Sequence, residues 1–196
     1  MPPLKARSFF VALVVAAGLL IAHRIVPVGY VARPIRVTIT QNRVPVASLD
    51  APRDPLFVAN AHVSTVDFLD GTSFEHRLFG NFHLTQDFFA ELSTTMSVIV
   101  PGRYVFGVAA DDGFRLEVGD RMLGQTTAPQ SYSEQEFTTD LGVGTFAYRL
   151  LYFQGQARLG LQAFYRRADE ERRYLIGEDS PFITFSAPEP GAAGKR

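Results

Sequence analysis

Short runs in which apolar and polar residues alternate dominate the chain after residue 32. The run IRVTITQ at 35–41 alternates at a period of two, which is typical of a strand with one buried face. Turn signals rich in Gly, Pro, Asp or Asn separate this run from further strand-like segments. Those segments are 56–68, 77–84, 96–100, 104–108, 114–118, 121–123, 145–153, 157–165 and 181–186. Many short strands at such spacing predict an all-β fold, either an antiparallel β-sandwich or a barrel.

Only a few segments after residue 32 depart from the strand pattern. The stretches 42–55 and 124–136 are polar or rich in proline, so they are expected to be loops. The charged run RRADEERR at 166–173 is the one segment predicted to form a short helix, and 87–92 is expected to make a single helical turn. The β-domain is therefore assigned to 33–187.

The N-terminus carries a different pattern. Ser8–Ala22 is 15 residues long without a charge, and Lys5 and Arg7 precede it. This pattern predicts an uncleaved signal anchor, so residues 1–32 are interpreted as a cytoplasmic stub and a single transmembrane helix in the inner membrane. A cleavable signal peptide is the alternative, although Tyr30 is bulky where cleavage prefers a small residue. With the anchor retained, the sandwich lies on the periplasmic or extracellular side.

The rest of the composition mainly excludes functions. The chain has no cysteine, so it has no disulfide, no thiolate metal site and no lipid anchor on an N-terminal cysteine. Three of the 19 basic residues precede residue 33, which leaves 16 against 20 acidic side chains. A nucleic-acid surface would be strongly basic, so no such partner is expected. Neither H-E-x-x-H nor G-x-S-x-G occurs, and we predict that the protein is not an enzyme. The tail, 188–196, is expected to be disordered.

One pair of adjacent acids stands at the junction of two predicted strands. Asp111 and Asp112 follow an apolar run and precede the alternating run that starts at Phe114. Two carboxylates held side by side repel each other, which raises their pKa values unless a cation or hydrogen-bond donors neutralise them. Calcium takes 6–8 oxygen ligands and would relieve the conflict. A solvated turn is the alternative, since Asp and Gly are common turn residues.

A second acidic pair, Glu134 and Glu136, lies in the polar segment 124–136. Paired carboxylates can hydrolyse glycosides, but only when one acid is buried and faces the other across a cleft. We interpret this pair as part of a solvated loop. The arginines of 166–173 interleave with acids, as in a salt-bridged surface segment.

Several motifs in order suggest a known family. They are GRYVF at 102–106, DDGFRL at 111–116, VGD at 118–120, LGVGTFAYRLLY at 141–152 and ARLGL at 157–161. Together they resemble the PA-fourteen family, the β-sandwich domain of anthrax protective antigen, yeast flocculins and bacterial adhesins. Family members usually carry a tryptophan before the first motif. This chain has no tryptophan, so Phe88, Phe89 and Leu92 are expected to fill the corresponding volume of the core.

The resemblance implies a site as well as a fold. In the family's lectins a cis peptide joins the two aspartates, both carboxylates bind calcium, and sugar hydroxyls bind the calcium. It therefore assigns Asp111 and Asp112 to calcium, with Gly113 beside them in the ligand site. The lectins' later loop supplies another ligand, for which this chain offers Gln154 or Gln156.

Two functions remain open from these observations. The first is a membrane-anchored, extracytoplasmic, calcium-dependent module that binds a carbohydrate or polysaccharide. The second is a structural or protein-interaction domain with partners in an inner-membrane assembly of the cell envelope. In that case the two aspartates only shape their loop.

Overall fold

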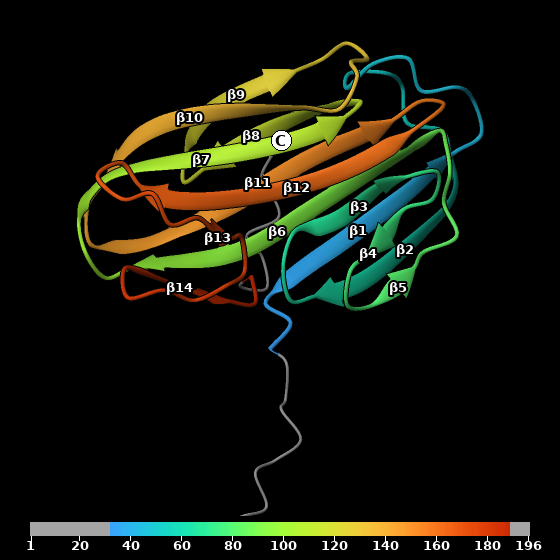
Figure 1. The fold of residues 1–196 in the computed structure, drawn as a ribbon. Helices are drawn as coiled ribbons and strands as arrows, with labels where there is room; N and C mark the ends of the chain where they lie inside the picture. Colours follow the sequence, from blue (N-terminus) through green and yellow to red (C-terminus); the bar gives the residue numbers. More distant parts are fainter. Residues whose placement is uncertain (1–31, 189–196) are drawn as a thin grey trace, which may run out of the picture. The chain divides into compact units, whose positions relative to one another are not determined.

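The computed structural model describes residues 32–188, which form two antiparallel β-sheets that face each other (Figure 1). The predicted β-sandwich is confirmed. Within this described part, no helix is long and apolar enough to cross a membrane. The anchor predicted for residues 1–32 lies outside the described residues except for its last position, and so does the predicted tail except for Pro188.

Sheet A is ordered β2-β1-β6-β11-β8-β9, and β14 pairs with β6 beyond the end of β1. The strands in that order are β2 (Pro55–Val63), β1 (Ile35–Asn42), β6 (Phe88–Val98), β11 (Gly144–Gln154), β8 (Gly113–Val118), β9 (Arg121–Thr126) and β14 (Ile183–Ser186).

Sheet B is ordered β10-β7-β12-β3-β4-β5, and β13 pairs with β12. Its strands are β10 (Ser133–Leu141), β7 (Gly102–Asp111), β12 (Leu159–Arg167), β3 (Asp67–Gly71), β4 (Glu75–His76), β5 (Gly80–Asn81) and β13 (Tyr174–Leu175). The chain thus crosses from sheet B to sheet A between β7 and β8, at the two aspartates.

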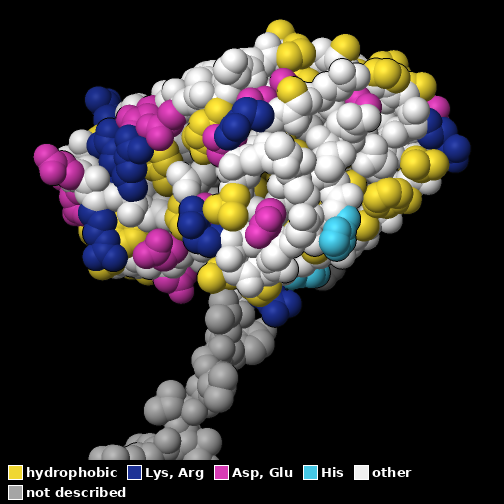
Figure 2. Space-filling model, turned by 45° about the vertical axis from the view of Figure 1, so that its right-hand side comes forward, with side chains coloured by type: hydrophobic (Ala, Val, Ile, Leu, Met, Phe, Trp, Pro, Cys, Tyr) yellow, Lys and Arg dark blue, Asp and Glu magenta, His cyan; other side chains and the backbone are white. Residues whose placement is uncertain are grey.

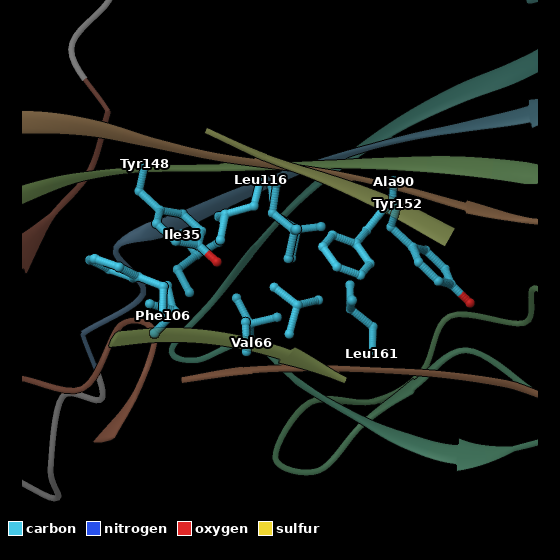
Figure 3. Close-up of a cluster of buried hydrophobic side chains, with 14 of the residues drawn as sticks. Ile35, Val66, Ala90, Phe106, Leu116, Tyr148, Tyr152 and Leu161 are labelled. Atoms are coloured by element: carbon cyan, nitrogen blue, oxygen red, sulfur yellow. The ribbon is translucent and has the colours of Figure 1, made fainter. Parts of the chain in front are cut away.

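The core lies between the sheets because the alternating apolar residues of both point inward. In Figure 3, Leu116 and Tyr148 of sheet A face Phe106 and Leu161 of sheet B. Aromatic rings fill much of the space. The rings of Phe68 and Phe74, for example, stack with centroids 4.0 Å apart, and further rings continue toward Tyr152. Phe88 and Leu92 are buried in this core, as expected in the absence of tryptophan. Phe89 is also buried, but it packs in a separate small cluster with Phe153.

Some sequence predictions of local structure are wrong. No helix forms at 166–173, because β12 continues through Arg167 and a turn follows. Arg166 pairs in the ladder opposite Val105, and its guanidinium bonds Glu136 at 3.0 Å. Its charge is therefore satisfied across strands rather than along a helix. The expected helical turn at 87–92 is also absent, since β6 begins at Phe88.

The segment 77–84 was expected to be a strand and is mostly turns, whereas 133–141 forms a strand that was not predicted. The first is mostly turns, with only Gly80 and Asn81 paired, and its apolar rings pack inward from a loop, as Phe82 does against Phe74. The second was expected to be a loop over its first part but forms β10. Only Phe137 and Leu141 in it are apolar, so its alternation is weak in the sequence.

The edge strand β2 is unusually exposed. Its consecutive residues Leu56, Phe57 and Val58 are exposed by 55%, 46% and 55%. Within residues 32–188, β2 pairs with β1 on one side and with no strand on the other. Figure 2, in which the right-hand side of Figure 1 comes forward, shows small groups of hydrophobic side chains along its upper and right-hand margins.

Candidate functional site

The two aspartates lie at the end of the sandwich where β1, β7 and β11 terminate, at the upper right of Figure 1. Asp111 is the last residue of β7, Gly113 is the first of β8, and Asp112 makes the crossing between the sheets. A cis peptide bond joins Asp111 to Asp112. The bond is the one that the resemblance implied for this pair.

Asp112 is almost fully buried, with 6% of its surface exposed. Its Oδ2 accepts a hydrogen bond of 2.8 Å from the backbone N–H of Gly155, in the loop after β11. Burial raises the pKa of the Asp112 carboxyl, and the N–H of Gly155 partly offsets that rise. A Cβ at position 155 would lie 2.7 Å from the carbonyl oxygen of Val46. Glycine therefore lets this loop approach both Asp112 and the loop after β1.

Asp111 is half-buried beside it, and its Oδ2 accepts a hydrogen bond of 3.2 Å from the backbone N–H of Tyr132. Burial raises the pKa of the Asp111 carboxyl, and the charges of Asp112 and Asp70 raise it further. The N–H of Tyr132 and the more distant guanidinium of Arg158 act in the opposite direction. Ionisation of both carboxyls is therefore less favourable in the folded protein than it is for the same groups in water.

Tyr152 fixes the backbone of the pair from below. Its hydroxyl contacts the carbonyl oxygen of Asp111 and lies 2.5 Å from Oε1 of Gln154. Burial and the charges of Asp112 and Asp111 raise the pKa of Tyr152 well above its ordinary value, so the hydroxyl keeps its proton and donates. Strand β11, which carries Tyr152, thus holds the segment between β7 and β8 against sheet A.

The two glutamines predicted as further ligands occupy different surroundings. Gln154 is fully buried, and its Nε2 donates to the carbonyl oxygens of Gln156 at 3.2 Å and Arg158 at 2.9 Å. Its amide oxygen faces Tyr152, so Gln154 supports the loop beside the aspartates. The side chain of Gln156 is exposed.

The donor set fits a hard cation. The Oδ2 atom of each aspartate accepts a hydrogen bond from a backbone N–H. Within residues 32–188 the two Oδ1 atoms accept no hydrogen bond, and both remain accessible to solvent. No cluster of three or more His, Cys, Asp or Glu side chains suited to a metal occurs in the described part of the chain. A calcium ion would therefore take these two carboxylates together with neutral oxygens and water.

Comparison with solved structures places this arrangement in a known fold. The PA14 domain of the MpAFP antifreeze protein superimposes with a TM-score of 0.61 at 13% identity, over 81% of this chain and 93% of that one. A PA14 sugar-binding domain from an RTX adhesin gives 0.59 at 14% identity, over 74% and 95%. The chain has the PA14 fold.

Adhesins of yeast share this PA14 fold. The epithelial adhesin 9 A domain from Candida glabrata, solved with Galβ1-4GlcNAc, superimposes with a TM-score of 0.56 at 10% identity, over 78% of this chain and 89% of that one. No protein-family model and no curated protein matches the sequence. At these identities the likeness establishes the PA14 fold and leaves the ligand to be argued from the site.

Several residues of this site are not evident from the sequence. Tyr132 and Gly155 supply the N–H donors from loops that are far from the aspartates in the chain, and their backbone roles leave no side-chain signal. Tyr152 lies in a motif that the family resemblance includes, but its contact with Asp111 requires the folded sheet. Gly155 stands between the predicted strands 145–153 and 157–165, where a glycine indicates a turn but not a donor to Asp112.

Proposed function

We propose that the chain is a calcium-dependent carbohydrate-binding module. The observation that carries the proposal is the pair Asp111 and Asp112, joined by a cis peptide at the end of the sandwich. Each keeps one carboxylate oxygen without a hydrogen bond from residues 32–188. The adhesin domains with the same fold support a sugar as the ligand.

The chain's own residues would prepare the site in three ways. The N–H groups of Tyr132 and Gly155 hold Oδ2 of the two aspartates and so orient the Oδ1 atoms. Tyr152 fixes the backbone between the two sheets. Gly113 allows the start of β8 to pack against β9, because a Cβ there would lie 2.3 Å from the carbonyl oxygen of Thr126. A bound calcium would supply a positive charge and open coordination positions for sugar hydroxyls.

We further propose that residues 1–32 tether this module to the inner membrane, with the sandwich on the outer side. Exchange of two waters for two hydroxyls on a metal gives little net free energy, so a single site binds weakly. Modules of this kind gain strength when several engage one ligand. A tethered single module therefore suits capture of a polysaccharide with repeating units.

Binding of sugars by the full-length chain, purified in detergent, tests the proposal. A glycan array is probed with calcium and again with EDTA, using wild type and Asp112→Asn. We expect binding of neutral sugars that disappears with EDTA and in the variant. Binding of a neutral sugar that persists in EDTA at wild-type strength would contradict the assignment of the aspartates.

A structural or protein-interaction domain is the second candidate. The observation that favours it is the exposed apolar run Leu56, Phe57 and Val58 on the open edge of β2. Exposed apolar side chains on an unpaired edge are typical of a surface that another protein covers. An anti-sigma factor domain-containing protein also shares the fold, with a TM-score of 0.57 at 18% identity, over 74% of this chain and 46% of that one. Binding of an envelope protein that is lost in Phe57→Asp but kept in EDTA would favour this candidate.

A further inference from the structure

The outer face of sheet A contains a groove of about 460 Å³ that lies on strands β1, β6, β11 and β8. These four strands lie side by side (Figure 1). The volume is within the range of small-molecule sites, roughly 300–1,000 Å³. Asp111 and Asp112 do not line the groove, so it is separate from the site described above.

The strand register arranges the polar side chains of the groove in rows. Arg36 pairs with Ser93, Ser93 pairs with Arg149, and Arg149 pairs with Glu117, on four successive strands. Residues directly opposite each other on one face have Cβ atoms about 4.5–5.5 Å apart. Arg36 and Arg149 therefore flank the hydroxyl of Ser93 from both sides.

Most charges in the groove have partners within the protein. Arg115 pairs with Asp50 at 3.0 Å, and Arg149 lies 3.9 Å from Glu117. Glu91 lies 3.3 Å from Arg53, outside the groove. The lining holds three arginines against two glutamates, so its net charge is positive.

Arg36 is the exception among these charges. It is half-buried, and no carboxylate within residues 32–188 lies at ion-pair distance from it. A guanidinium presents a planar fork of donors that matches a carboxylate. Among the described residues Arg36 is therefore a cation of the groove without a carboxylate partner, and it can receive an anion from outside.

The remaining lining indicates what kind of anion fits. The hydroxyls of Ser93 and Thr95 make no side-chain hydrogen bond within residues 32–188, and they lie beside the aliphatic side chains of Ala147 and Leu151. The one aromatic residue of the lining, Tyr148, is 1% exposed. Free hydroxyls and small aliphatic surfaces suit a sugar ring better than an apolar protein surface.

We propose that this groove is a second binding site, which takes a carboxylated polysaccharide with a uronate on Arg36. The carboxylate accepts hydrogen bonds from the guanidinium, while Ser93 and Thr95 contact the ring hydroxyls. Binding here requires no calcium. The site is therefore independent of the function proposed for Asp111 and Asp112.

Isothermal titration of the full-length chain in detergent with hexagalacturonate, in EDTA and at low salt, tests the proposal. The acid is expected to bind, and its methyl ester is not, because esterification removes the charge. Hydrogen bonds to a charged group contribute about 1.5–3 kcal/mol, so Arg36→Gln should weaken binding at least about tenfold. The affinity of Arg36→Lys should lie between those of wild type and Arg36→Gln, because lysine keeps the charge without the planar guanidinium fork.

Two controls separate this site from general charge and from the calcium site. Arg121→Gln removes the same charge from an exposed position on β9 outside the groove and should change affinity less than about twofold. The double variant Asp111→Asn, Asp112→Asn should bind hexagalacturonate like wild type in EDTA. Equal losses in Arg121→Gln and Arg36→Gln, unchanged affinity in a folded Arg36→Gln, or equal binding of the ester would each overturn the proposal.

Discussion

Two pairs of acidic side chains in this sandwich differ in whether basic side chains lie beside them. Glu134 and Glu136 on β10 lie against arginines of neighbouring segments, with Arg173 at 3.0 and 2.9 Å and Arg166 at 3.0 Å. Asp111 and Asp112 have no ion pair with any basic side chain in residues 32–188 and receive only backbone N–H groups.

The difference supports the proposal that the aspartates, and not the glutamates, bind a cation. The glutamates are neutralised by the protein itself, so they form a structural surface cluster. Burial raises the pKa of both aspartates, and their mutual repulsion adds to that of Asp111. A cation from solution would remove this unfavourable free energy.

The largest expected effect is loss of the calcium response in Asp112→Asn. A ligand at 100 times its Kd stabilises a protein by about 2.7 kcal/mol. For a chain of this length that corresponds to roughly 5–11 °C in Tm, at 2–4 °C per kcal/mol. Thermal melts in EDTA and in saturating calcium measure it. The double variant Glu134→Gln, Glu136→Gln should keep the full calcium increment, and equal loss in both variants would remove the distinction between the pairs.

A smaller effect is expected at the loop that holds Asp112. In Gly155→Ala the new Cβ would lie 2.7 Å from the carbonyl oxygen of Val46 and 3.3 Å from Oδ2 of Asp112. Overpacking of this kind costs about 1–3 kcal/mol, and the displaced N–H should also reduce the calcium increment. Gly142→Ala is the matched control, because nothing lies within 4 Å of its Cβ. Chemical denaturation with and without calcium compares the two, and similar behaviour would show that the loop does not hold the site.

Tyr152→Phe should lower the free energy of unfolding somewhat less than Gly155→Ala does. The change removes the hydroxyl that contacts the Asp111 carbonyl and the amide oxygen of Gln154, and it leaves the ring in place. Loss of a buried donor costs about 1–3 kcal/mol. Denaturant midpoints measure the loss. Tyr165→Phe, which removes a buried hydroxyl bound to the Glu178 carbonyl at 2.9 Å, is a control that should lower stability without lowering calcium affinity.

The smallest effect is a pH dependence in EDTA. The pKa values of Asp111 and Asp112 are raised in the folded state above their ordinary value of 3.8, so folding favours their protonated forms. Their contribution to stability is complete below 3.8 and is lost as pH rises through the raised values. The Tm of wild type, measured against the double Asn variant, should therefore rise as pH falls from neutral toward 4. With calcium the trend should reverse, because protons compete with the metal. A flat difference in EDTA would contradict the burial of the pair.

Alternation predicted the strands that have one buried face and failed elsewhere for physical reasons. IRVTITQ became β1 as expected, since its apolar residues all face the core. β10 was missed because it presents only Phe137 and Leu141 inward as apolar residues. The run at 77–84 is apolar but packs its rings from a loop, which periodicity cannot distinguish from a strand.

The site was predictable only where side chains carry it. Asp111 and Asp112 are adjacent in sequence, and the cis bond between them follows the family resemblance. The donors from Tyr132 and Gly155 are backbone groups of loops brought together by the fold, so no residue type marks them. The groove at Arg36 depends on strand register, which places residues from four distant segments in one row.

Direct titration of calcium into the chelator-treated, full-length chain at neutral pH is the most direct test of the account. We predict saturable binding of one calcium ion per chain in wild type and in the Glu134→Gln, Glu136→Gln variant, with no binding in Asp112→Asn. Absence of calcium binding to the folded wild type, or equal binding to Asp112→Asn, would contradict the claim that a cation neutralises the two aspartates.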